Sequence, residues 1–105
     1  NTAWRTRAGR NPRVNVWESD EGLAVEAEVA GVEPDKLDVA VDANVLTIKG
    51  EREQEDGGTS EFQRSFNLPF ELESDKIKAA VKNGMLTITI PRKAAEKRRI
   101  AIEKL

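Results

Sequence analysis

The strongest constraint on the fold is a two-residue alternation of apolar and polar side chains between residues 14 and 90. In residues 23–29, for example, Leu23, Val25, Ala27 and Val29 alternate with Ala24, Glu26 and Glu28. Alternation with this period puts one set of side chains on one face of a strand and therefore predicts strands with one buried face. Seven segments fit the pattern: residues 14–16, 23–29, 37–41, 46–48, 62–68, 77–81 and 86–90.

The segments between these predicted strands have the composition of turns. Asn83-Gly84 separates two alternating runs, and this dipeptide favours a tight type I′ hairpin because both central residues need a positive φ. Strands spaced every 8–15 residues, with no convincing helical stretch, predict an all-β fold of two packed antiparallel sheets. We therefore expect an immunoglobulin-like β-sandwich of about seven strands, followed by a C-terminal tail.

The absence of two residue types excludes most familiar chemistry. The chain of 105 residues has no Cys and no His, which excludes disulfides, Ser-His and Cys-His catalysis, and nearly all zinc sites made of side chains. Glu26 and Glu28 are paired carboxylates on an exposed strand face, but no aromatic platform for a sugar accompanies them. We predict no enzymatic activity, no catalytic or metal-binding residues and no cofactor.

Charge is distributed unevenly along the chain. Residues 1–13 carry four arginines and no acid, residues 18–61 carry 14 acidic and 3 basic side chains, and residues 92–105 carry six basic and two acidic ones. The acidic middle would repel a nucleic-acid backbone, so no nucleic-acid partner is predicted. No apolar run approaches the ~20 residues that span a bilayer, so we expect no membrane association and a cytoplasmic location.

The C-terminal tail combines a basic tether with two isoleucines. Residues 92–99 follow Pro91 and contain no large apolar side chain, whereas Ile100 and Ile102 lie on one side of an extended segment. Apolar side chains at a chain end predict a partner groove. The eight tether residues reach at most about 26 Å, which permits docking on a neighbouring molecule or on the same one.

Several motifs in this order resemble the α-crystallin domain of small heat shock proteins. Residues 30–37 (AGVEPDKL) resemble the family's acidic turn into a strand, and residues 46–52 (LTIKGER) its L-x-I-x-G-E-R strand end. Residues 62–69 (FQRSFNLP) resemble F-x-R-x-F-x-L-P, and residues 79–88 (AAVKNGMLTI) the A-x-x-x-N-G-x-L signature. The final Ile-Ala-Ile, residues 100–102, is similar to the family's I-x-I tail motif.

The resemblance implies an ATP-independent holdase, a chaperone that binds unfolding client proteins and keeps them from aggregating under stress. It also implies self-association, as a homodimer or a larger oligomer, in which Ile100 and Ile102 dock in a groove. The residues expected to form the groove come from two predicted strands: Leu37, Val39 and Val41, and Ile77, Ala79 and Val81. A second hypothesis is a cochaperone-like sandwich that docks on a folded chaperone and holds no client.

Arg64 is the most unusual residue of the predicted sandwich. It alternates with Phe62 and Phe66, so it faces the same side as two aromatic rings, where an unpaired guanidinium would be costly. The resemblance implies a structural arginine near the subunit interface, paired with a carboxylate. The alternative is a solvated position at a sheet edge.

The chain departs from bacterial and plant relatives in one connection. In those relatives a long loop between the two central motifs carries a strand that swaps into the partner subunit, whereas here residues 51–61 contain no apolar residue. We expect a bacterial-type domain with this connection shortened, and edge-to-edge pairing, a shorter swap and a small dimer all remain open. The predicted parts are the end of an N-terminal arm (1–11, incomplete because the chain starts without Met), the sandwich (12–91) and a C-terminal extension (92–105).

Overall fold

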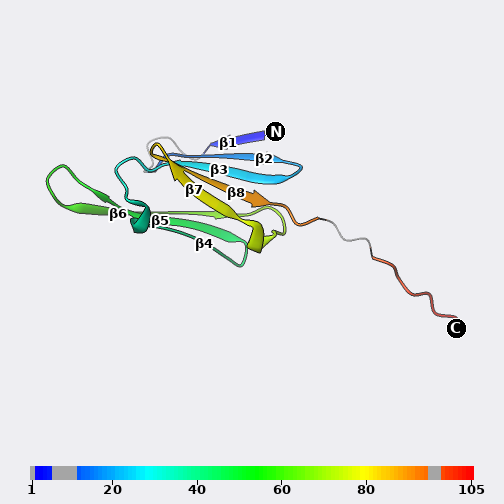
Figure 1. Ribbon diagram of the computed structural model, residues 1–105. Helices are drawn as coiled ribbons and strands as arrows, with labels where there is room; N and C mark the ends of the chain where they lie inside the picture. Colours follow the sequence, from blue (N-terminus) through cyan, green and yellow to red (C-terminus); the bar gives the residue numbers. More distant parts are fainter. Residues whose placement is uncertain (1, 6–11, 95–97) are drawn as a thin grey trace.

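The computed structural model describes residues 2–5, 12–94 and 98–105, and it consists of two antiparallel β-sheets and an extended tail (Figure 1). The strands are β1 (Thr2–Arg5), β2 (Val14–Ser19), β3 (Gly22–Glu28), β4 (Leu37–Asp42), β5 (Val45–Glu53), β6 (Thr59–Asn67), β7 (Lys78–Lys82) and β8 (Met85–Pro91). Single 3₁₀ turns, η1 (Pro34–Lys36) and η2 (Ser74–Lys76), precede β4 and β7. All seven predicted strands are present, and the predicted all-β sandwich is confirmed.

One strand was not predicted. β1 lies in the segment assigned to the N-terminal arm, and it pairs antiparallel with β2, with Thr2 opposite Glu18 and Arg5 opposite Asn15. Four residues are too few for an alternation pattern to be recognised. The sandwich therefore includes part of the expected arm.

The strand order identifies the edges of each sheet. The larger sheet has the order β1-β2-β3-β8-β7, and the smaller one has the order β4-β5-β6. Within the described residues, β7 and β1 are thus the outer strands of one sheet, and β4 and β6 those of the other. An outer strand leaves one row of backbone N–H and C=O groups without a neighbouring strand, and such a row is a template for pairing with another chain.

The core is made of the apolar faces that the alternation predicted. Every side chain that is buried in the described part of the chain is apolar. Leu46, Ile48, Ile88 and Ile90 are fully enclosed and come from the central strands β5 and β8. Burying a side chain of this size contributes about 1.5–3 kcal/mol, so the two inner faces hold the sheets together.

Two hairpins close with residues in the left-handed region. Asn83 and Gly84 have φ values of 52° and 76°, which confirms the predicted type I′ turn between β7 and β8. Between β4 and β5, Ala43 and Asn44 adopt φ values of 48° and 64°. An amide of the Asn44 side chain donates a hydrogen bond of 3.0 Å to the Phe70 carbonyl, which ties this turn to the segment before β7.

The connection between β5 and β6 is a hairpin that extends past the rest of its sheet (Figure 1). β4 begins opposite Gly50, so Glu51–Glu53 of β5 pair only with residues 59–61 of β6. The turn is closed by a 2.7 Å hydrogen bond from the Gln54 N–H to the Gly58 carbonyl. No further strand lies between β5 and β6, as the shortened connection predicted.

Candidate functional site

The two strands predicted to form a groove are both edge strands. β4 is the outer strand of the small sheet, and β7 is the outer strand of the large one. At the other side of the small sheet, Arg64 of β6 bonds to Pro12, which precedes β2. Because β6 faces the β2 side of the larger sheet, β4 lies toward the β7 side, as Figure 1 shows.

The six predicted groove residues differ in exposure. Leu37, Val39 and Val41 are half-buried and pack against the core, and so does Ile77. Ala79 and Val81 are exposed. β4 therefore offers an apolar row that is anchored in the core, and β7 offers small apolar side chains that solvent reaches. Binding of the tail between them remains a prediction.

The tail isoleucines are exposed. Ile100 and Ile102 retain 87% and 96% of their accessible surface, and Leu105 is fully exposed. Figure 1 shows residues 98–105 extending away from the sandwich. Three large apolar side chains in water at the end of a chain are costly, and their burial on a partner would be favourable.

The start of the tail is held by the sandwich. The backbone of Arg92 forms an isolated antiparallel β-bridge with Leu72, and the Arg92 N–H donates to the Glu21 carbonyl at 2.9 Å. The Arg92 guanidinium lies 4.2 Å from the centroid of the Phe70 ring and 3.3 Å from a carboxylate oxygen of Glu18. The Lys93 N–H donates to the Glu71 carbonyl at 2.9 Å, so the chain is held up to residue 93.

Arg64 is half-buried on the inner face of β6. Its Nη1 donates a 2.6 Å hydrogen bond to the Pro12 carbonyl, and its guanidinium carbon lies 5.5 Å from the centroid of the Phe66 ring. Phe62, on the same face, is buried, and Phe66 is half-buried. The hydrogen bond joins the edge of the small sheet to the segment before β2. That this cluster contributes to a subunit interface remains a prediction.

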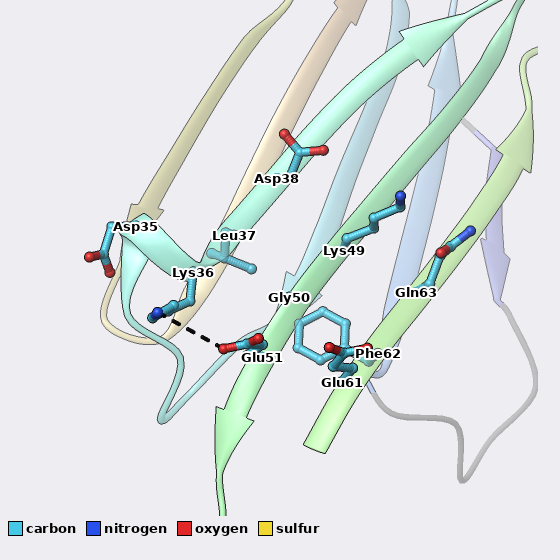
Figure 2. A pocket seen from close by; sticks show the side chains of 10 residues that line it. All are labelled: Asp35, Lys36, Leu37, Asp38, Lys49, Gly50, Glu51, Glu61, Phe62 and Gln63. Carbon is cyan, nitrogen blue, oxygen red and sulfur yellow. Dashed lines mark ion pairs between the residues drawn. The ribbon is translucent and has the colours of Figure 1, made fainter. Parts of the chain in front are cut away.

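A hollow of about 620 Å³, which the sequence did not predict, lies where β4, β5 and β6 meet η1 (Figure 2). Leu37, Gly50 and Phe62 are opposite one another in the sheet register, and charged side chains line the rest. A Cβ atom at Gly50 would collide with the Phe62 ring, so the ring covers the glycine. Recognising this site required the strand register, which the sequence does not give.

None of the helical segments in the described residues is long and apolar enough to cross a membrane. Within the same ranges, acidic side chains form no group of three or more that would hold a metal ion.

Comparison with known proteins identifies the family. A model of the Hsp20/alpha crystallin family matches residues 15–103, which include the sandwich from β2 to β8 except for Val14, and the two isoleucines of the tail. The chain belongs to this family. Membership supports a chaperone role.

Relatives and solved structures agree with this assignment. The chain is 35% identical over 99 residues to the small heat shock protein C2 of Rickettsia felis, and 34% identical over 108 residues to an 18.3 kDa class I heat shock protein of Oxybasis rubra. These matches cover 84% and 91% of this chain, but only 64% and 67% of the relatives. The chain thus spans about two thirds of the length of such relatives.

The sandwich is also similar to solved small heat shock proteins. A small heat-shock protein from Xylella fastidiosa, described as having a distinct high order structure, matches with a TM-score of 0.76 and 32% identity over 92% of this chain and 100% of that one. Heat shock protein 16.0 from Schizosaccharomyces pombe matches with a TM-score of 0.71 and 30% identity, covering 88% of this chain and 97% of that one.

Proposed function

We propose that this Hsp20/alpha crystallin family member is an ATP-independent holdase, not an enzyme, that binds unfolding proteins in the cytoplasm and prevents their aggregation. The observation that carries the proposal is the combination of family membership with exposed apolar residues at the chain end and unpaired strand edges on the domain. Unfolding proteins expose apolar segments and unpaired backbone, and both can bind to such surfaces.

We further propose that the protein self-associates through its tail. Ile100 and Ile102 would dock between β4 and β7 of a neighbouring subunit, where an extended segment adds backbone hydrogen bonds along an edge. Burying each isoleucine contributes about 1.5–3 kcal/mol before the costs of ordering and association. A single tail contact is therefore weak, and several tails acting together give a stable oligomer.

The Arg64 cluster is proposed to support a dimer interface. Arg64, Phe62 and Phe66 are three neighbours on the inner face of an edge strand, and inward-facing charge on such a strand limits unspecific pairing. A second subunit could complete the pairing of β6 without exchanging a strand.

Suppression of aggregation tests the holdase activity. A heat-labile enzyme is heated with the full chain at near-stoichiometric ratios without ATP, and light scattering is followed. We expect scattering to fall, and the trapped enzyme to regain activity when a refolding chaperone system is added. Unchanged scattering at a threefold excess of the full chain would refute the holdase assignment. Binding to a folded chaperone in the same samples would then favour the cochaperone hypothesis.

The tail contact is tested by size. The double substitution Ile100→Gly and Ile102→Gly should shift oligomers toward smaller species in sedimentation velocity, because both buried side chains are lost. The substitution Ala101→Gly in the same tail is the matched control, since it changes flexibility without removing an anchor. Equal size distributions for the double variant and the unchanged chain would show that the tail does not link subunits.

A further inference from the structure

An apolar cleft lies between the two sheets on the side of β2 and β6. It has a volume of about 270 Å³. Two residues of its lining, Ser65 and Asn67, are exposed and alternate with Phe66, so they lie at the rim. The walls are six apolar side chains from the inner faces of the sandwich: Val16, Leu23 and Val25 from β2 and β3, and Leu46, Phe66 and Leu68 from β5, β6 and the residue after β6.

The cleft is closed at one end and opens at the edge of the small sheet. Farther along β6, the hydrogen bond from Arg64 to the Pro12 carbonyl joins this strand to the segment before β2. Val25 and Leu46, at the back of the cleft, are almost completely buried, whereas Phe66 is half-buried. Solvent therefore reaches the cleft beside Phe66, along the edge of β6.

The size and the lining of the cleft suit one apolar side chain. An apolar cavity of about 150 Å³ can hold a benzene molecule, and it stays dry because water needs polar partners. The cleft beside Phe66 is larger, so it has room for a leucine or phenylalanine side chain. Such a side chain would supply the van der Waals contacts that Val16 and Leu46 lack on this side.

The strand beside the cleft is an edge strand. β6 is the outer strand of the small sheet, so one row of its backbone N–H and C=O groups faces no other strand of the described residues. An extended segment can pair with such an edge, and every second side chain of the segment then points toward the interior. Pairing with β6 would therefore bring a side chain of the segment to the cleft.

The larger sheet extends past the small one on this side. β1 lies beyond β2, and the register of the two strands puts Trp4 opposite Val16, which is part of the cleft wall. Among the described residues, the small sheet has no strand beyond β6 that would face β1. A segment added to β6 would become a fourth strand of the small sheet and would lie against β1.

We propose that β6 and the cleft bind an extended apolar segment of an unfolding protein, with one large apolar side chain of the segment in the cleft. Unfolding proteins expose apolar side chains together with unpaired backbone, and the cleft and the strand edge are complementary to these two features. The inference rests on the proposed holdase function, and it adds the place where a client is held. Because the proposed dimer also uses β6, a subunit pairs this edge either with a client or with a second subunit.

A second copy of the chain is a poorer occupant of the cleft. The large apolar side chains of its own β6 are Phe62 and Phe66, which are buried in its core or packed against it. They could enter a neighbouring cleft only by leaving these positions. The tail isoleucines, Ile100 and Ile102, are exposed, so competition by the tail has to be measured.

Peptide binding to the full chain tests the cleft. The probe is a short fluorescent peptide of threonine and serine with one central leucine, and a second peptide has asparagine in place of the leucine. We expect the leucine peptide to bind about tenfold more tightly, because only leucine fits an apolar site. Val16→Phe fills the cleft and should abolish this difference. Val81→Phe is the same change at an exposed position of β7, and it should leave the difference unchanged. A difference that persists in Val16→Phe would overturn the site.

A second measurement uses the unchanged protein, so it also decides the question where Val16→Phe does not fold. The peptide carries a photoreactive leucine analogue at its centre, and the linked residues are identified by mass spectrometry. We expect links to the cleft walls on β2, β5 and β6. Links confined to β4 and β7 would overturn the site. Complete loss of the cleft links with an equimolar peptide of residues 94–105 would show that the tail is the occupant, which would also overturn the proposal.

Backbone pairing is tested by methylation of the peptide nitrogens. Alternate N–H groups of a strand point to the same side, so methyl groups on one alternate set should abolish binding, and methyl groups on the other set should leave it unchanged. Equal effects of the two sets would overturn pairing with β6.

The aggregation assay tests the client role. Val16→Phe should suppress light scattering less than Val81→Phe does. Equal suppression by the two variants would overturn the cleft as the client site, whereas the holdase function would stand. No suppression by the unchanged chain would refute the holdase function and, with it, the client role of the cleft.

Discussion

Substitution of Gly22 tests how closely the first residue of β3 approaches the end of β8. It has a φ of +145° and lies opposite Pro91 in the β3–β8 ladder. A Cβ atom there would lie 2.8 Å from the Arg92 nitrogen and 3.0 Å from the Pro91 Cα atom, and it would overlap the Ile90 carbonyl oxygen. All three are backbone atoms, so no side-chain rotation relieves the contact.

Gly22→Ala should therefore be strongly destabilising. Overpacking against fixed atoms costs about 1–3 kcal/mol, and the positive φ adds about 1–2 kcal/mol. The sum of about 2–5 kcal/mol is a large part of the 5–15 kcal/mol by which typical domains are stable. The free energy of unfolding can be measured by urea titration with tryptophan fluorescence.

Gly31→Ala is the matched control for this measurement. Gly31 has a φ of +81°, but a Cβ atom there would meet nothing within 4 Å. In this variant the free energy of unfolding should fall by only about 1 kcal/mol, the cost of placing an alanine at a positive φ. If Gly22→Ala lowers the free energy of unfolding no more than Gly31→Ala does, β3 and the end of β8 do not approach as closely as the structure indicates.

Two further substitutions test the β4–β5 turn and the packing at Gly50. Ala43 has a positive φ in the β4–β5 turn, so Ala43→Gly should raise the free energy of unfolding by about 0.5–1 kcal/mol, whereas Ala40→Gly in β4 should lower it. A lower free energy of unfolding for both variants would contradict the turn geometry. Gly50→Ala should lower the free energy of unfolding by about 1–3 kcal/mol, because its Cβ collides with the Phe62 ring. Adding Phe62→Leu should recover part of this loss, and no recovery would show that the ring is not the cause.

The strands could be predicted because their signal is local. The residues of each buried face alternate with polar residues at a period of two in the sequence. Four of them, Leu46, Ile48, Ile88 and Ile90, were therefore predicted to lie in strands, and all four are fully buried. The turn at Asn83-Gly84 was also predictable, because a positive φ at two successive positions restricts the residue types.

Features that depend on register were not predictable in the same way. The hollow arises because Leu37, Gly50 and Phe62 align across three strands, and they are far apart in the sequence. The hydrogen bond from Arg64 to the Pro12 carbonyl spans 52 residues. The sequence predicted an inward-facing arginine but not its main-chain partner. β1 was missed because a strand of four residues has too short a pattern.

The fixed start of the tail has a consequence for architecture. Arg92 and Lys93 are bonded to the sandwich, so the domain fixes the path of the chain up to Lys93. In the proposed tail-linked oligomer, the domain would set the angle at which the tail leaves, and the number of residues up to Ile100 would set the spacing to the next subunit. In such an oligomer, lengthening or shortening this stretch should alter the diameter of the assembly, whereas removing the contacts of Arg92 should alter its curvature and its uniformity.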